Sequence, residues 1–187
     1  TFNQQPVVFA VATLNTKADE LAWVAECLRK SNITVITVDV STAKATGLAA
    51  DVTATDVLAA SGQSWDAVHT LDRGTAVNQM SDAFRVWLMQ QHEIGKVAGV
   101  IGLGGSGGTA IVTAGMRALP IGLPKLMVST MASGNTVPYI DCSDICLMPS
   151  VVDIAGLNTV SRRVLSNAAY AMAGMVKNTV RESDSEQ

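Results

Sequence analysis

Hydrophobic residues recur along the chain in five short runs, most of them bounded by polar residues, glycine or proline. The runs are rich in valine, isoleucine, leucine and methionine, and runs of this length and composition are typical of buried strands. They predict strands at residues 7–13, 33–40, 97–103, 126–130 and 144–149.

Between these runs, apolar residues are spaced three and four positions apart, which is the spacing of one helix face. They predict a helix from Asn15 or Thr16 to Asn32, another over residues 75–92, a third over 109–119 and a long final helix through Met172. The region between residues 41 and 74 is less regular. There we expect a loop, a short helix near 53–60 and a small strand near 67–71.

Strands and helices therefore alternate, which predicts an α/β domain with a doubly wound, mostly parallel, Rossmann-like sheet of five or six strands. The simplest order is the flavodoxin-like 2-1-3-4-5, with strands 7–13 and 97–103 as neighbours at the topological switch point. Ligands of such sheets bind beyond the carboxyl ends of the strands at that point. We expect residues 1–180 to form a single lobe and residues 181–187 to form a polar tail or a linker to a missing second lobe.

Composition narrows the function classes. Hydrophobic residues make up 48% of the 187 residues and aromatic residues only 4%, which indicates the aliphatic core of a parallel sheet. The net charge is −3, whereas proteins that bind nucleic acid or an anionic membrane usually carry an excess of positive charge, so we expect neither as a partner. Residues 97–116 are uncharged over the length of a membrane span, but glycine, serine and threonine interrupt them, which favours a strand, a loop and a helix.

The chain has three cysteines, and this odd number favours a reducing compartment over a disulfide framework. Cys142 and Cys146 are four positions apart, but both histidines lie far upstream, so we predict no metal site. The first residues, TFNQQP, carry neither the basic nor the apolar segment of a secretory signal. We therefore expect a cytoplasmic protein.

The stretch VIGLGGSGGTA at residues 100–110 joins a predicted strand to a predicted helix. Its serine, Ser106, matches a nucleophile elbow of the form G-x-S-x-G, but that motif needs a later histidine, and both His69 and His92 precede it. The glycines also match the dinucleotide pattern G-x-G-x-x-G, yet no acidic residue for a ribose lies between Glu93 and Asp141. A Walker A loop is excluded because no Gly-Lys-Ser/Thr follows.

These observations disfavour the dinucleotide pattern, and the nucleophile elbow would need a base from a missing domain. Two other interpretations of this stretch are favoured. Glycines let backbone N–H groups approach an anion closely, and the start of the following helix adds a positive dipole, so the stretch could cradle a phosphate. The hydroxyls of Ser106 and Thr109 and the charge of Lys17 would then assist. Alternatively, the glycines only allow the strand and the helix to pack closely together.

Further polar residues cluster where predicted strands end. Asp39 ends the second strand, where a carboxylate could bind a ribose hydroxyl, and Ser129 and Thr130 lead from another strand into a small polar loop. Arg73 opens a helix and could meet a phosphate. No catalytic residue and no metal ligand stands out. The candidate nucleotide-binding residues are Thr13, Asn15, Thr16, Lys17, Asp39, Arg73, Gly104, Gly105, Ser106, Gly107, Gly108, Thr109, Ser129, Thr130, Gly134 and Asn135.

Five segments, taken in order, are more specific than any one of them: TLNTKADE, LDRGTAV, GLGGSGGT, PKLMVSTMASGN and SVVDIAGLN. Over residues 7–175 the set resembles the family typified by the plant tobamovirus-resistance protein, the inhibitor of tomato mosaic virus RNA replication. The resemblance implies a Rossmann-like ATP-binding domain that is often dimeric. Members of that family are longer and have a second lobe, so the resemblance also implies that this chain is an N-terminal lobe.

Position by position, the family's TLDTK-type loop corresponds to residues 13–17 of this sequence. Asn15 stands where an aspartate is common, which weakens a metal-binding role at that position. The glycine signature corresponds to residues 104–109 without departure, and the VST and SGN segments correspond to residues 128–130 and 133–135. Nothing in these residues transfers the antiviral role of the plant protein to this chain.

The main hypothesis is a nucleotide-binding domain in which the phosphates of ATP or ADP lie on the backbone of residues 104–108. Mg²⁺ could accompany the phosphates, although the sequence names no ligands for it. The first alternative is one lobe of a two-lobe enzyme that acts on a small phosphorylated or carboxylated metabolite. The second is a purely structural dimerisation lobe, and we expect a homo-oligomer, a dimer, for the main hypothesis too.

Overall fold

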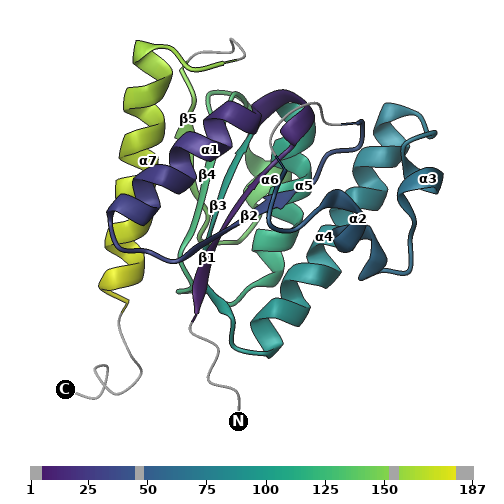
Figure 1. Cartoon of the computed structure of the whole chain (residues 1–187), viewed down its shortest axis with the longest axis horizontal. Coiled ribbons are helices and arrows are strands. Elements are labelled where there is room, and N and C mark those ends of the chain that lie inside the picture. Colours follow the sequence, from purple (N-terminus) through teal and green to yellow (C-terminus); the bar gives the residue numbers. More distant parts are fainter. Residues whose placement is uncertain (1–5, 45–48, 152–155, 180–187) are drawn as a thin grey trace.

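The computed structural model describes residues 6–44, 49–151 and 156–179. Within them, five strands form one parallel sheet in the order β2-β1-β3-β4-β5 (Figure 1). The strands are β1 (Val7–Ala12), β2 (Val35–Asp39), β3 (Val97–Gly104), β4 (Lys125–Ser129) and β5 (Cys146–Pro149). The predicted fold class and strand order are confirmed.

Helices cover both faces of this sheet (Figure 1). One face packs against α1 (Leu14–Lys30) and α7 (Thr159–Lys177). The other face packs against α2 (Ala54–Ala59), α4 (Arg73–Glu93) and α5 (Ser106–Ala118). The short helices α3 (Trp65–Val68) and α6 (Val137–Ile140) contact α4 and α5, respectively.

The central strand β1 shows why its sequence is a continuous apolar run. Phe9 belongs to the core on the α4 and α5 side, where its ring meets that of Trp87 edge-on with the centroids 5.1 Å apart. Val8 and Ala10 belong to the core on the α1 and α7 side. Because alternate residues of a strand point to opposite faces and both faces are covered, every position must be apolar.

Two glycines allow close packing in the layer formed by β3, α4 and α5. A Cβ atom on Gly115 of α5 would lie 2.6 Å from the ring of Phe84 on α4, so only a bare backbone fits where these helices touch. A Cβ on Gly102 of β3 would lie 2.5 Å from Val112. Part of the glycine content therefore serves packing alone.

Two local predictions are wrong. Residues 67–71 do not form a strand, because α3 occupies the start of this range and the hydroxyl of Ser64 caps it by accepting the N–H of Ala67 at 3.3 Å. The predicted loop at 104–108 is mostly the first turn of α5, which begins at Ser106 rather than Thr109. The carbonyl of Gly105 accepts the N–H of Thr109 at 2.9 Å and so starts the helix earlier.

The long uncharged stretch at residues 97–116 divides between β3 and α5, as the strand-and-helix interpretation expects. Among the helices of the described ranges, none combines the length and the apolar character that a bilayer crossing requires. The predicted tail at 181–187 lies outside the described residues.

Candidate functional site

A cavity of about 630 Å³ lies beyond the carboxyl ends of β1 and β3, at the switch point of the sheet. The first turns of α1, α4 and α5 border it. Small-molecule sites commonly measure about 300–1,000 Å³, so the cavity is large enough for a nucleotide-sized ligand. Its lining residues are Thr13, Asn15, Thr16, Lys17, Thr42, Ala43, His69, Leu71, Arg73, Ala76, Val77, Gly105, Ser106, Gly107, Gly108 and Ile111.

The cavity brings together two segments that sequence analysis placed at the switch point. Thr13 directly follows β1, and Gly108 lies in the first turn of α5. A Cβ atom on Gly108 would lie only 3.9 Å from the side-chain oxygen of Thr13. The predicted contact residues that line the cavity are Thr13, Asn15, Thr16, Lys17, Arg73, Gly105, Ser106, Gly107 and Gly108.

The first turn of α5 presents backbone donors to this cavity. Its N-cap residue is Gly105, which has no side chain that could accept them. Among the described residues, no hydrogen-bond partner is found for the N–H groups of Ser106, Gly107 and Gly108, whereas the next N–H, that of Thr109, is bonded to Gly105. Unpaired N–H groups at a helix start carry partial positive charge and are suited to an anion.

The glycines of this turn separate the two interpretations that the sequence left open. A Cβ on Gly104 would lie 2.8 Å from the backbone nitrogen of Thr109, so packing excludes a side chain there. The nearest atoms to a Cβ on Gly105, Gly107 or Gly108 would be 3.7, 3.5 and 3.5 Å away, which is ordinary contact. None of these three has the positive φ that favours glycine. Packing therefore explains Gly104 but not the three glycines that line the cavity.

The cavity is bordered by cations although the protein as a whole is acidic. Its lining includes Arg73 and Lys17, of which Lys17 is paired with Glu20, and the described lining has no aspartate or glutamate, in a chain of net charge −3. A Cβ on Gly107 would lie 4.0 Å from Nη2 of Arg73, so the guanidinium group reaches the first turn of α5. This distribution of charge favours an anionic ligand.

Arg73 owes its place to the start of α4. The preceding residue, Asp72, is the N-cap, and its carboxylate accepts the N–H of Thr75 at 3.1 Å. Hydrogen bonds from the side chain and backbone of Thr75 hold the pKa of Asp72 below its ordinary value. The cap fixes the first turn of α4 and thereby sets where the Arg73 side chain leaves the backbone.

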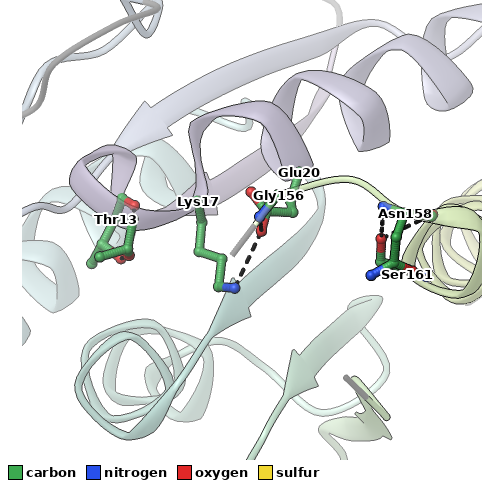
Figure 2. Close-up of polar contacts among 7 residues, drawn as sticks. Thr13, Lys17, Glu20, Gly156, Asn158 and Ser161 are labelled. Atoms are coloured by element: carbon green, nitrogen blue, oxygen red, sulfur yellow. Dashed lines mark hydrogen bonds and ion pairs between the residues drawn. The ribbon is translucent and has the colours of Figure 1, made fainter. Parts of the chain in front are cut away.

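Lys17 also lines the cavity, but its ammonium group is engaged elsewhere (Figure 2). Its Nζ lies 3.2 Å from Oε1 of Glu20, one helical turn further along α1. The backbone of Lys17 is not helical (φ −132°, ψ 26°), so a kink separates the first residues of α1 from the rest. The predicted contribution of Lys17 to a phosphate therefore requires its side chain to leave Glu20.

Asp39, the predicted ribose contact, has another role in the structure. Its carboxylate is buried and accepts the N–H groups of Leu14 at 3.1 Å and Ser41 at 2.9 Å, as well as the hydroxyl of Ser41. The same hydroxyl oxygen accepts the N–H of Asn15 at 3.2 Å. These bonds satisfy the start of α1, so Asp39 joins β2 to α1 and does not line the cavity.

The remaining predicted contacts lie behind or beside the first turn of α5. Thr109 and Ser129 are buried, and their hydroxyl oxygens lie 2.6 Å apart, which ties α5 to the end of β4. Gly104 and Thr130 line a separate small cavity of about 30 Å³. Gly134 and Asn135 are exposed in the loop after β4, outside the lining of the larger cavity.

Sequence analysis missed an apolar part of the lining: Leu71, Ala76, Val77 and Ile111, together with Thr42, Ala43 and His69. The sequence predicted a small strand at 67–71, which includes His69. Instead, His69 follows α3, its ring stacks on Trp65 with centroids 5.7 Å apart, and its Nδ1 lies 2.8 Å from the carbonyl oxygen of Trp65. Ser64, a helix-capping residue type before Trp65, was the overlooked signal.

The described residues contain no group of three or more histidine, cysteine, aspartate or glutamate side chains placed to hold a metal ion. Cys142 and Cys146, the pair four positions apart, are exposed free thiols, and Cys27 is buried.

Comparison with known proteins identifies the family of the chain. A family model described as "Uncharacterised protein family (UPF0261) N-terminal domain" matches residues 6–181. The chain belongs to the UPF0261 family. The family model is that of an N-terminal domain, which agrees with the lobe expected from the sequence.

Relatives from bacteria and a plant are similar over nearly the whole chain. A UPF0261 protein of Mesorhizobium japonicum is 50% identical over 169 residues, which are 90% of this chain and 42% of the relative. The ToMV resistance protein Tm-1(GCR237) of Solanum lycopersicum is 44% identical over 190 residues, covering 93% of this chain and 25% of the relative. A UPF0261 protein of Clostridium tetani is 39% identical, covering 96% and 45%. The chain thus spans less than half the length of these relatives.

Proposed function

We propose that the chain binds the phosphate groups of a nucleotide, ATP or ADP, at the first turn of α5. The observation that carries this proposal is the set of Gly105, Gly107 and Gly108. Neither packing nor a positive φ requires glycine at these positions, yet all three line the 630 Å³ cavity. A ligand that must approach the backbone closely explains them, because any side chain there would occupy its place.

The donors at this turn suit a phosphate group. The N–H groups of Ser106, Gly107 and Gly108 and the Ser106 hydroxyl can each donate to a phosphate oxygen, and the helix start adds about half a positive charge. Arg73, whose Nη2 would lie 4.0 Å from a Cβ on Gly107, supplies a full charge beside the same turn. Hydrogen bonds to charged groups contribute about 1.5–3 kcal/mol each, so a few of them can support micromolar binding.

The rest of the cavity suits the less polar part of a nucleotide. Leu71, Ala76, Val77 and Ile111 give an apolar wall, and His69 offers an aromatic ring held by Trp65. Such a mixture of apolar surface with a few placed polar groups is the usual composition of small-molecule sites. We assign the phosphates to α5 and the base and sugar to the side of the cavity lined by His69, Leu71 and the start of α4.

The absence of carboxylates from the described lining limits the chemistry that we propose. Any Mg²⁺ that accompanies the nucleotide would be bound by phosphate oxygens and water rather than by protein carboxylates. The lining also offers no carboxylate as a general base, so the proposal is one of binding and not of hydrolysis.

A second candidate follows from length. Because the chain spans less than half of its relatives, the cavity could be one wall of an active site that a second lobe completes. The substrate would then be a small phosphorylated or carboxylated metabolite. Binding of a sugar phosphate, rather than ATP, would favour this candidate.

Calorimetric titration of the 187-residue chain with ATP, ADP and ribose 5-phosphate tests the proposal. We expect micromolar binding of ATP or ADP, lost in Gly107→Val, because the valine side chain fills the space above the N–H groups. Gly134→Val, at an exposed glycine outside the cavity, is the matched control and should bind normally. Nucleotide binding that is absent in the wild-type chain, or unchanged in Gly107→Val, contradicts the proposal.

We also propose that the chain forms a homodimer, as the family resemblance implies. Sedimentation of the chain over a range of concentrations tests this directly. A monomer at every concentration would contradict it without affecting the nucleotide proposal.

A further inference from the structure

Lys17 lies between two cavities on either side of the β3–α5 connection. It lines the 630 Å³ cavity together with Gly105 and Gly108, and it also lines the cavity of about 30 Å³ together with Gly104. Lys17 therefore borders both cavities, and the partner of its ammonium group determines which of the two cavities the positive charge faces. In the structure this partner is Glu20 (Figure 2).

The ion pair between these residues is shielded from water. The side chains of Lys17 and Glu20 are only 18% and 7% exposed, and Nζ and Oε1 lie 3.2 Å apart. Shielding makes the attraction between two charges stronger than at an open surface. While it lasts, the pair neutralises the lysine charge that would otherwise face the larger cavity.

Glu20 also has a second hydrogen-bond partner, in the segment before α7. Its Oε1 accepts the backbone N–H of Gly156 at 3.1 Å, in the segment that leads into α7 (Figure 2). Gly156 has φ +97°, a conformation that favours glycine, and Asn158 caps α7 immediately afterwards. The carboxylate of Glu20 is thus fixed between α1 and the start of α7, whereas the long lysine side chain has several rotatable bonds. Of the two partners, Lys17 is the one that can move.

We propose that Glu20 is a positioning residue that competes with the bound phosphate for Lys17 and so sets the affinity of the site. A phosphate at the first turn of α5 draws the ammonium group of Lys17 from Glu20 into the larger cavity, and Glu20 stays bonded to Gly156. A phosphate with two negative charges attracts the ammonium group more strongly than the single charge of Glu20 does. This inference rests on the proposed function, because it names how one residue of that site is regulated.

The test compares ATP affinity in Glu20→Gln and in the wild-type chain by calorimetry. Glutamine keeps an oxygen for the N–H of Gly156 but removes the charge that holds Lys17. We expect Glu20→Gln to bind ATP about three- to tenfold more tightly, since the phosphate no longer has to break an ion pair. Glu26→Gln is the matched control. Glu26 forms an exposed ion pair with Lys30 near the other end of α1, so its loss should leave ATP affinity unchanged.

A double-mutant cycle shows whether the effect acts through the lysine. Lys17→Met should weaken ATP binding, and Glu20→Gln added to Lys17→Met should then bring no gain. Thermal unfolding of each variant confirms that it is folded. Wild-type binding with an unchanged affinity in Glu20→Gln, or a gain that persists without Lys17, overturns the inference and leaves the proposed function intact. Absence of ATP binding in both wild type and Glu20→Gln overturns the two together.

Discussion

The carboxylate of Asp39, at the end of β2, accepts the backbone N–H of Leu14, at the start of α1, at 3.1 Å across 25 positions of the chain. The same carboxylate oxygen accepts the N–H of Ser41. One buried acidic side chain thereby satisfies donors at the start of the helix that borders the candidate site. The start of α5 has no such carboxylate, and among the described residues no partner is found for the N–H groups of Ser106, Gly107 and Gly108.

Asp39→Ala should lower the free energy of unfolding by at least about 2 kcal/mol, because it leaves the buried N–H groups of Leu14 and Ser41 without an acceptor. Urea denaturation measures the loss. Asp82→Ala, on an exposed position of α4, should stay within about 0.5 kcal/mol of wild type. A stable Asp39→Ala variant that loses only nucleotide affinity would instead support the ribose contact expected from the sequence.

Gly115→Ala should destabilise the domain by about 1–3 kcal/mol, because the new methyl group would lie 2.6 Å from the ring of Phe84 and force α4 and α5 apart. Gly174→Ala in α7 is the matched control, since nothing lies within 4 Å of the added Cβ. In that exposed helix position alanine should stabilise the protein by about 0.5–1 kcal/mol. Denaturant titration of both variants should show opposite signs, and equal effects would contradict the packing argument.

Arg73→Ala should weaken ATP binding about tenfold or more, because it removes a charged donor beside Gly107. Arg85→Ala changes an exposed arginine on the same helix and should leave the affinity within about twofold of wild type. Calorimetry at two salt concentrations adds a second criterion. The affinity of Arg73→Ala should depend less on salt than that of the wild type, and an equal dependence would remove Arg73 from the site.

The pair of Lys125 and Asp144 should make stability depend on pH. The side chain of Lys125 is 0% exposed, its ammonium group donates to Asp144, and Asp144 also accepts the N–H of Gly122 at 2.7 Å. Partial burial acts to raise the pKa of Asp144. The hydrogen bonds from Lys125 and Gly122 and the charge of Lys125 outweigh burial and lower the pKa from its ordinary value of 3.8.

A lowered pKa in the folded state means that this carboxylate stabilises the protein above pH 3.8 and that the contribution is lost as the pH falls below that value. Asp144→Asn should therefore destabilise the domain at pH 7, and the difference from wild type should shrink toward pH 3. Urea denaturation at pH 7, 5, 4 and 3 measures it, with Asp82→Asn as control. A difference that is constant over this range would show that the charge of Asp144 contributes nothing.

Several site residues could be predicted because their signals are local. The glycines of residues 104–108 stand out by composition, and Thr13 and Lys17 follow directly from the end of a predicted strand. His69 could not be placed, because a short apolar segment does not distinguish a strand from a helical turn. Ser64 caps the start of α3, so this segment is helical. His69 directly follows α3 and lines the cavity.

The order 2-1-3-4-5 was expected as the simplest doubly wound arrangement, and the structure confirms it. The sequence by itself determined the alternation of strands and helices and the hand of the crossovers between them. These follow from the spacing of apolar residues along short segments and from the single hand of parallel crossovers. Only the tertiary structure decided which polar groups face the cavity. The carboxylate of Asp39 accepts the N–H of Leu14, and the hydroxyl of Thr109 is hydrogen-bonded to that of Ser129. In both cases the partner lies far away in the chain. A buried polar group binds whichever partner the fold brings to it, and residue type alone does not name that partner.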